Sequence, residues 1–366
     1  MVSFRLGGPD GVSVQAATWA RALERLGYSL RRVAGELADG TRPGDVVIPG
    51  LAVAAEAAPG PAGQRPTAPE GPSAGELRAA LEGSAVVVVE NMLSLPLHLE
   101  AARVLTAVLA DLPAETRVLL HHHDFAWQRP ETAQVTELPP RLPRAVHVTI
   151  NDFSRRELAE RGIEAVTVRN AFDLEAPPGL RTETREALGV GSDEILVLQP
   201  TRAIARKNIP AALRLAEGLA VRLRRPVRYW LPGPAEDGYA AILAEVLAAT
   251  TVPVLRTHPG AVGFGMDDAY AACDLVVFPS TGGEGFGQPV IESVWADRPL
   301  AVLSYPALDE ILALGFSFLP ADDPDVVAGA ILEPDATTMA RNRELAAAHF
   351  SMAALERSLE ALLRTR

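Results

Sequence analysis

The sequence predicts an α/β protein with two domains, each built around a doubly wound parallel sheet. Short apolar segments alternate with helical patterns along most of the 366 residues, and this alternation is typical of parallel strands joined by crossover helices. The chain is also long enough to form two separate cores. We expect an N-terminal domain over residues 1–176, a C-terminal domain over 177–335, and terminal helices over 336–366.

The first domain should open with a strand, a tight loop and a helix. Val2–Leu6 has the pattern of a strand, and Val14–Leu26 places apolar residues at helical spacing before Gly27 ends the helix. Residues 59–72 are rich in Pro, Gly and Ala and have no periodicity, which predicts a long loop, either an insertion or a lid. Further strands are expected at Ser29–Val33, Asp45–Ile48, Ala85–Glu90, Arg117–His123, Val146–Asn151 and Ala165–Arg169.

The second domain should follow a linker near residues 176–179. Helices are expected over 336–348 and 351–363, and Asp267 has the position of a helix N-cap. Asp323-Pro-Asp325 superficially resembles a DxD metal motif, but it precedes an apolar helix, so capping explains it. The strands and strand–turn segments of this half are expected at Glu194–Gln199, Tyr229–Pro234, Pro253–Gly260, Leu275–Phe278 and Phe316–Leu319.

Composition excludes several classes of function. A net charge of −12 argues against binding to nucleic acid and to anionic membranes. Apolar runs such as 85–89 are too short to span a bilayer, and the first residues lack the pattern of a signal peptide. The single cysteine, Cys273, excludes an intrachain disulfide and a cysteine metal cluster, so a cytoplasmic location is expected.

One glycine-rich segment suggests a phosphate site. The strand Leu275–Phe278 is followed by a glycine-rich turn carrying Glu284, and Pro289 is suited to the first position of a helix. A strand, a glycine turn and a helix start together present backbone N–H groups to an anion. Glu284 and Glu292 lie around this point and would accept hydrogen bonds from hydroxyls. A nucleotide-diphosphate sugar fits such a site.

A second loop supplies the positive charge. Of 34 Lys and Arg residues, only Lys207 is lysine, a compact point charge that arginine does not reproduce. Arg202 and Lys207 are five residues apart in a loop before a helix, so both can reach one diphosphate, whereas we expect Arg206 to point away. Gly233 belongs to a strand-and-turn segment of the kind that borders a nucleotide pocket.

The segment Glu284-Gly-Phe-Gly-Gln-Pro-Val-Ile-Glu292 resembles the donor motif of the retaining GT-B glycosyltransferases of family 4 (glycosyl transferases group 1). The resemblance is strongest over residues 194–310. It implies two Rossmann-like domains facing across a cleft, with the final helix crossing back to the first domain. Arg202, Lys207 and Glu284 would then act on the diphosphate and sugar, with Glu292 on the ribose. The resemblance adds further donor-binding candidates: Gly285, Phe286, Gly287, Gln288, Pro289 and, more loosely, Thr257 and His258.

The resemblance also marks residues of the N-terminal domain. Family 4 enzymes carry a histidine at the end of a strand that contacts the donor sugar; His123 is the best match here, with His122 as the alternative and Asp124 beside them. Three adjacent histidines cannot converge on one ion, so no zinc site is predicted. Asp10 and Gly11 belong to a loop that borders the cleft in the family.

The predicted activity is retaining transfer of a hexose from UDP-glucose, GDP-mannose or a similar donor to a hydroxyl of a small or saccharide acceptor. No metal or other cofactor is expected, because Arg202, Lys207 and the helix start can balance the diphosphate charge. Gln288 departs from the more usual apolar residue at that family position, and the acceptor cannot be read from the sequence. Two alternatives remain: a sugar-nucleotide 2-epimerase and a donor-binding protein without transfer activity.

Overall fold

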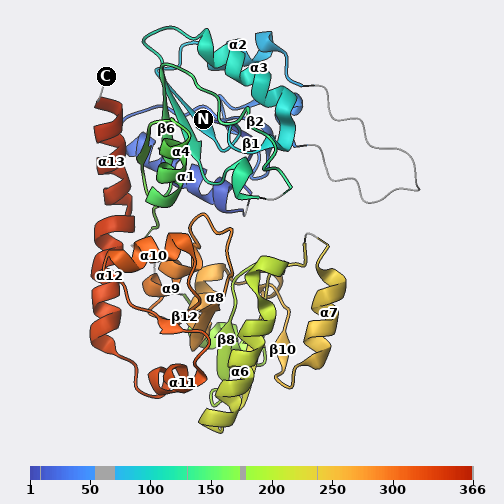
Figure 1. Cartoon of the computed structure of the whole chain (residues 1–366). Helices are drawn as coiled ribbons and strands as arrows, with labels where there is room; N and C mark the ends of the chain where they lie inside the picture. Colours follow the sequence, from blue (N-terminus) through green and yellow to red (C-terminus); the bar gives the residue numbers. More distant parts are fainter. Residues whose placement is uncertain (9, 54–70, 130, 174–178, 237, 365–366) are drawn as a thin grey trace, which may run out of the picture. The chain divides into compact units, whose positions relative to one another are not determined.

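The computed structural model describes residues 1–8, 10–53, 71–129, 131–173, 179–236 and 238–364. Most of the predicted loop, residues 59–70, and the linker residues 176–178 lie outside the described residues. The chain divides into two compact units (Figure 1): unit 1 comprises Met1–Ala171 and Met352–Arg366, and unit 2 comprises Phe172–Ser351. The last helix therefore returns to the unit that contains the N-terminus.

Unit 1 is a parallel sheet with helices on both faces. Its strand order is β3-β2-β1-β4-β5-β6-β7, so the direction of winding reverses between β1 and β4. The strands are β1 (Val2–Leu6), β2 (Val33–Leu37), β3 (Val46–Val47), β4 (Val86–Glu90), β5 (Arg117–His122), β6 (Ala145–Thr149) and β7 (Ala165–Thr167). The helices are α1 (Gly11–Arg25), α2 (Ala74–Leu81), α3 (Leu99–Ala110), α4 (Asp152–Glu160) and α13 (Met352–Arg364), with short 3-10 turns at Pro49–Leu51, Pro96–His98 and Ala126–Gln128.

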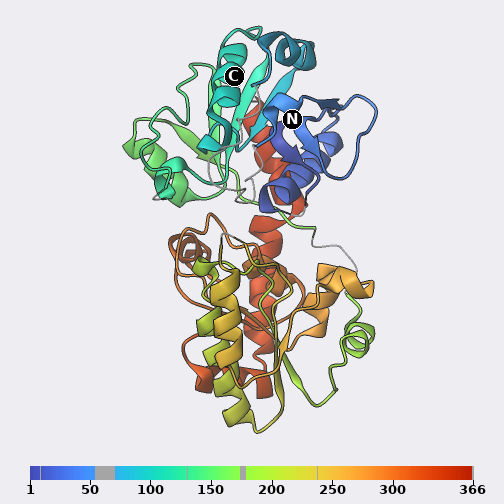
Figure 2. The same cartoon turned by 90° about the vertical axis from the view of Figure 1, so that its right-hand side faces the viewer.

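The apolar residues of the unit 1 strands face two separate cores. On one face, α2 and α3 pack against β1, β4 and β5, with Leu77 and Leu105 fully buried. On the other face, Trp19 of α1 and Leu359 of α13 pack over Leu119 of β5. Figure 2 shows the red helix α13 beside the blue helix α1. Burial on both faces explains why the strands read as continuous apolar runs.

Unit 2 repeats this architecture. Its strand order is β10-β9-β8-β11-β12-β13, with all described pairings parallel and a reversal between β8 and β11. The strands are β8 (Ile195–Leu198), β9 (Val227–Trp230), β10 (Val254–Leu255), β11 (Leu275–Phe278), β12 (Leu300–Val302) and β13 (Leu319–Pro320). The helices are α5 (Arg181–Ala187), α6 (Ile209–Leu223), α7 (Ala240–Ala249), α8 (Met266–Ala272), α9 (Pro289–Trp295), α10 (Pro306–Ala313), α11 (Pro324–Leu332) and α12 (Ala336–Phe350), with 3-10 turns at η4 (Ala205–Lys207) and η5 (Pro259–Val262).

In unit 2, α6, α7 and α11 supply one core with the strands, while α8 and α9 contact strands of the same sheet. The two doubly wound parallel sheets confirm the predicted fold class. Of the described helices, none is both long and apolar enough to cross a membrane.

Three local predictions were wrong. The predicted strand at Ser29–Val33 begins only at Val33, because Val33 is the residue that pairs with Val2 of β1. The predicted strand Phe316–Leu319 forms only at Leu319–Pro320, because these are the residues that pair with β12. Asp267 is not an N-cap: Gly265 holds that position, and its N–H donates to the Asp268 carboxylate (2.8 Å). By contrast, Asp323 caps α11 as predicted, accepting the N–H groups of Asp325 and Val326.

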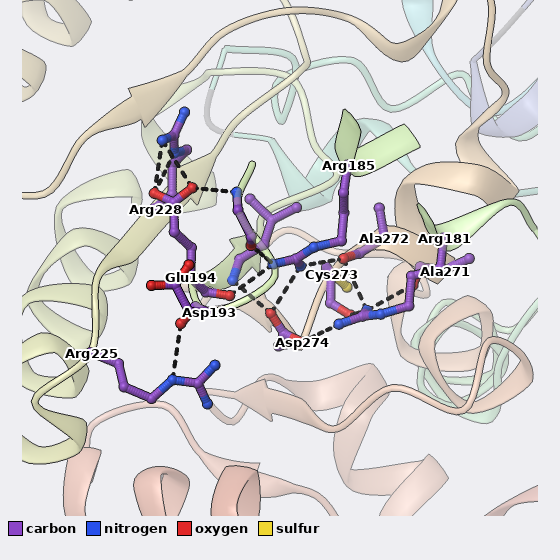
Figure 3. A network of polar contacts seen from close by, with 12 residues as sticks. Arg181, Arg185, Asp193, Glu194, Arg225, Arg228, Ala271, Ala272, Cys273 and Asp274 are labelled. Carbon is purple, nitrogen blue, oxygen red and sulfur yellow. Dashed lines mark hydrogen bonds and ion pairs between the residues drawn. The ribbon is translucent and has the colours of Figure 1, made fainter. Parts of the chain in front are cut away.

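Two arginines of α5 attach the start of unit 2 to its core (Figure 3). Arg181 and Arg185 donate to carbonyl oxygens at the end of α8, and both pair with Asp274. Cations at a helix C-terminus satisfy its free carbonyls and complement its dipole. Arg185 also donates to the carbonyls of Gly191 (2.7 Å) and Glu194 (2.8 Å), and its side chain is only 7% exposed.

Replacing Arg185 with alanine should destabilise unit 2 by about 3 kcal/mol, because Asp274 and several buried carbonyls would lose their donor. Guanidinium unfolding, followed by tryptophan fluorescence, measures this as a lower midpoint. Arg225→Ala is the matched control: Arg225 makes one exposed contact, to the Asp193 carbonyl (3.0 Å), and its loss should cost less than about 0.5 kcal/mol. Equal shifts of the unfolding midpoint in the two variants would show that Arg185 does not anchor α5 to the core of unit 2.

Candidate functional site

The carboxyl edge of the unit 2 sheet brings together the loops that follow β8 and β11. These strands are neighbours on either side of the reversal in strand order, which is where open α/β sheets bind ligands. Lys207, in the loop after β8, donates from Nζ to Oε1 of Glu284 (2.6 Å), in the loop after β11. Ser280 donates to the same oxygen (2.8 Å). The two loops therefore form one polar cluster.

Local backbone geometry explains why this turn needs glycine. Gly283 and Gly287 adopt φ values of 63° and 85°, in the left-handed region where a side chain is strained. A Cβ on Gly287 would also come within 2.2 Å of the Tyr305 hydroxyl. That hydroxyl donates to the Phe286 carbonyl (2.9 Å), so the turn folds tightly against α10. Pro289 begins α9, as predicted.

A buried side-chain amide fixes the backbone of Lys207. Gln199, at the end of β8, donates from its side chain to the Lys207 carbonyl (2.8 Å) and accepts from the Tyr229 hydroxyl (2.5 Å). The Lys207 ammonium lies 4.8 Å from the ring centre of Phe278. Its side chain is 10% exposed and that of Glu284 is 7% exposed. Both charges are thus positioned before any ligand arrives.

Burial and mutual attraction set the protonation of this pair. Burial lowers the pKa of Lys207 to about 8, partly opposed by the charge of Glu284. Burial raises the pKa of Glu284, but Lys207 and Arg206 outweigh it, and the net pKa of Glu284 is lowered. At neutral pH the cluster contains an ammonium beside a carboxylate.

Arg206 was expected to point away, and this was wrong. Its guanidinium forms an ion pair with Oε1 of Glu284. The 3-10 turn η4 places Arg206 and Lys207 next to each other, and the left-handed conformation of Asn208 then redirects the chain into α6. Arg202 instead pairs with Glu236 (2.6 Å) and keeps a half-exposed side chain.

Glu292, in the first turn of α9, has a different environment. The Tyr270 hydroxyl of α8 donates to its Oε2 (2.5 Å). Burial raises the pKa of Glu292 to about 7; the Tyr270 hydrogen bond opposes this rise and Asp267 adds to it. This carboxyl group therefore titrates near neutrality.

These two pKa values predict a bell-shaped pH profile. If donor binding needs charged Lys207 and ionised Glu292, kcat/KM for the donor should fall above about pH 8 and below about pH 7. Tyr270→Phe removes a hydrogen bond that lowers the pKa of Glu292, so the acidic limb should move to higher pH while the alkaline limb stays. An unchanged acidic limb in this variant would show that Glu292 is not the titrating group.

The other donor-side candidates belong to further segments of unit 2. Gly233 lies against the backbone of Thr201, where a Cβ would approach its carbonyl oxygen to 2.1 Å. The Thr257 carbonyl accepts from the Trp230 indole (2.8 Å), and His258 caps η5 by accepting from Gly260. Phe286 is buried, whereas Gly285 and Gln288 are partly exposed.

The predicted residues of unit 1 lie at the carboxyl edge of its own sheet. His123 follows β5 and is 7% exposed, and its Nε2 lies 3.3 Å from Oε2 of Glu90. His122 points to the other face, where it contacts Ser94 (2.6 Å) and His147 (2.9 Å), as strand alternation predicted.

The remaining unit 1 candidates take part in local polar contacts. Asp124 pairs with Arg129 (3.0 Å). Asp10 caps α1 through the Ser13 N–H (3.1 Å) and pairs with Arg5 (2.8 Å), while Gly11 is the first residue of α1.

Sequence reasoning missed five residues of these clusters: Arg206, Ser280, Tyr270, Glu90 and its partner His121. Ser280 and Arg206 adjoin predicted residues, so the loop sequences offered a signal for both. Tyr270 and Glu90 reach their partners from distant segments. Their signals are weaker: Glu90 is the one acidic residue at the end of an apolar strand, and Tyr270 lies in a helix beside the motif strand.

The chain is similar to known glycosyltransferases. Mannosylglucosylglycerate synthase of Petrotoga mobilis is 25% identical over 86% of this chain and 84% of that protein. The enzyme of the same name from Thermotoga maritima is 28% identical over 68% of this chain and 64% of that protein. No protein-family model matches the chain.

Solved structures show the same fold. Anabaena HepE, determined in complex with UDP-glucose, superimposes with a TM-score of 0.70 at 18% identity and covers both chains fully. Sucrose-phosphate synthase from Thermosynechococcus elongatus gives a TM-score of 0.67 at 15% identity, over 99% of this chain and 98% of that one. The chain therefore has the GT-B fold, and the proteins to which it is similar are glycosyltransferases, as its resemblance to family 4 predicted.

Proposed function

We propose that the protein transfers a hexose, with retention of configuration, from a nucleotide-diphosphate sugar to a hydroxyl of a small or saccharide acceptor. The observation that carries this proposal is the buried pair of Lys207 and Glu284 at the point where the strand order of unit 2 reverses. Such a place favours a nucleotide, and the pair offers a cation for the diphosphate beside an acceptor for sugar hydroxyls.

Lys207 would stabilise the departing diphosphate as the bond between the sugar C1 and the phosphate oxygen breaks. The new bond forms between C1 and the acceptor oxygen, and the acceptor proton passes to the departing phosphate oxygen. Arg206 and Arg202 would add positive charge nearby, so the proposal assigns no metal to the diphosphate. Glu284 would hold sugar hydroxyls and Glu292 the ribose, while His123 remains a candidate contact of the transferred sugar.

For the donor we propose UDP-glucose or GDP-mannose. The names of the two relatives refer to a product that contains mannosyl, glucosyl and glycerate groups, and one fold neighbour was solved with UDP-glucose. A small glycosylated hydroxy acid such as glucosylglycerate is therefore the first acceptor to test.

A product assay tests the proposal. The protein is incubated with each donor, with and without glucosylglycerate, and NMR identifies the products and their anomeric configuration. We expect a new glycoside with the anomeric configuration of the donor, formed only with acceptor. An epimerised sugar nucleotide without acceptor would identify a 2-epimerase, and donor binding without any product, across a panel of small hydroxylated acceptors, would identify a binding protein.

A further inference from the structure

A second buried polar cluster lies in unit 1, at the carboxyl edge of its sheet. Glu90 ends β4, His121 lies on β5 beside it, and His123 follows two residues later. Oε2 of Glu90 is 2.8 Å from Nδ1 of His121 and 3.3 Å from Nε2 of His123. One nitrogen or oxygen from each residue lies within 4.8 Å of the others.

Strand geometry explains this convergence. Glu90 and His121 are directly paired in the parallel ladder of β4 and β5. His121 and His123 point to the same face because side chains alternate along a strand, and His122 points to the opposite face. Three adjacent histidines cannot converge on one ion, because the middle one, His122, points away from the other two. The structure replaces the middle one with a carboxylate from the neighbouring strand.

Glu90 is a buried carboxylate whose side-chain partners are the two histidines, and the Met1 ammonium is a further positive charge that acts on it. The side chains of Glu90 and His121 are 0% exposed, and within the described ranges neither a lysine nor an arginine forms an ion pair with Glu90. Both histidines reach Oε2, whereas Oε1 has no partner among the described residues. A buried polar atom without a partner is costly, and a bound cation would give Oε1 one.

We propose that Glu90, His121 and His123 bind a divalent transition-metal ion of the zinc class. Two imidazole nitrogens and a carboxylate are a donor set that zinc uses in sites with an open fourth position. Zinc–ligand bonds of about 2.1 Å separate tetrahedral ligands by about 3.4 Å, so the closest pair must open by about half an ångström. Oε1 of Glu90 is then available as a second carboxylate ligand.

The surroundings suit such an ion. The ring of Trp19 stacks on His121 at a centroid distance of 4.1 Å and fixes its orientation. Asn91 accepts the backbone N–H of His123 (2.9 Å), which holds the following loop in place. His123 is the one of the three ligands with some exposure, 7%, and so lies on the route to solvent. The proposal shares only His123 with the proposed function, and its test measures metal content rather than glycosyl transfer.

Metal content of the full-length protein tests this proposal. The protein is stripped with a chelator, equilibrated with Zn²⁺, desalted and analysed by mass spectrometry of the metal. We expect about one zinc ion per chain in the wild type and at most about a tenth of that in Glu90→Gln and His123→Gln. Zinc should also raise the thermal midpoint of the wild type by about 5 to 10 °C, and of neither variant.

His147→Asn is the matched control, since it removes a buried histidine on the opposite face and should retain the zinc. If Glu90→Gln does not fold, His123→Gln decides, with the visible absorption of bound Co²⁺ as a second readout. Wild-type protein that keeps no zinc would overturn the proposal. So would equal zinc in the wild type and His123→Gln, which would locate binding at other histidines. Neither result depends on glycosyl transfer.

Discussion

Lys207→Ala should lower kcat/KM for the donor by about 10³-fold, which is the scale expected for removing a preorganised charge from a developing anion. Lys207 is buried, bonded to Glu284 and anchored through its carbonyl by Gln199. The loss should appear in kcat as well as in KM, because the diphosphate gains charge as the glycosidic bond breaks. Steady-state kinetics at pH 7.5, a value chosen below the pKa of about 8, measures it.

Two further variants show whether the effect is specific to the lysine at this position. Lys207→Arg keeps the charge but places a wider, planar group over Phe278, so it should also be strongly impaired. Arg222→Ala removes an exposed cation that pairs with Asp325 on α11, and it should behave like the wild type. Wild-type turnover in Lys207→Arg would mean that any cation suffices here, and wild-type turnover in Lys207→Ala would remove Lys207 from the reaction.

Glu284→Gln should lower kcat/KM by about 10²-fold and change its pH dependence. The carboxylate raises the pKa of Lys207 against the effect of burial. Without that charge the pKa of Lys207 falls, so the ammonium is lost at a lower pH. The alkaline limb of the profile should therefore move to lower pH, in addition to the loss of a sugar-hydroxyl acceptor.

Ser280→Ala is the control for Glu284→Gln. It removes one hydrogen bond to Oε1 of Glu284 but leaves the carboxylate. We expect a loss of less than about tenfold, with the alkaline limb close to its wild-type position. A wild-type alkaline limb in Glu284→Gln would show that the charge of Glu284 does not govern Lys207.

The sequence was informative wherever a local pattern determines the structure. Apolar runs predicted most strands because both faces of each sheet are covered. The glycines between Phe278 and Pro289 predicted a tight turn, and the structure shows left-handed backbone at Gly283 and Gly287. Lys207 stood out by composition, and it is the buried lysine of the cluster.

Contacts between distant segments could not be predicted in this way. Arg206 and Lys207 are neighbours in sequence, and only the 3-10 turn η4 decides that both reach Glu284. Tyr270 and Glu292 come from different helices, and the pKa of Glu292 depends on burial that no local pattern reveals. Glu90 was part of a predicted strand, yet its role depends on the register between β4 and β5.

Donor binding by calorimetry tests the central claim most directly, namely that the Lys207–Glu284 cluster binds the diphosphate of a nucleotide sugar. UDP-glucose, GDP-mannose and UDP-N-acetylglucosamine are titrated in parallel into the wild type, Lys207→Ala and Arg222→Ala. We predict that one donor binds the wild type and Arg222→Ala with a micromolar dissociation constant and that Lys207→Ala binds it at least about tenfold more weakly. Equal affinity in all three proteins would contradict the account.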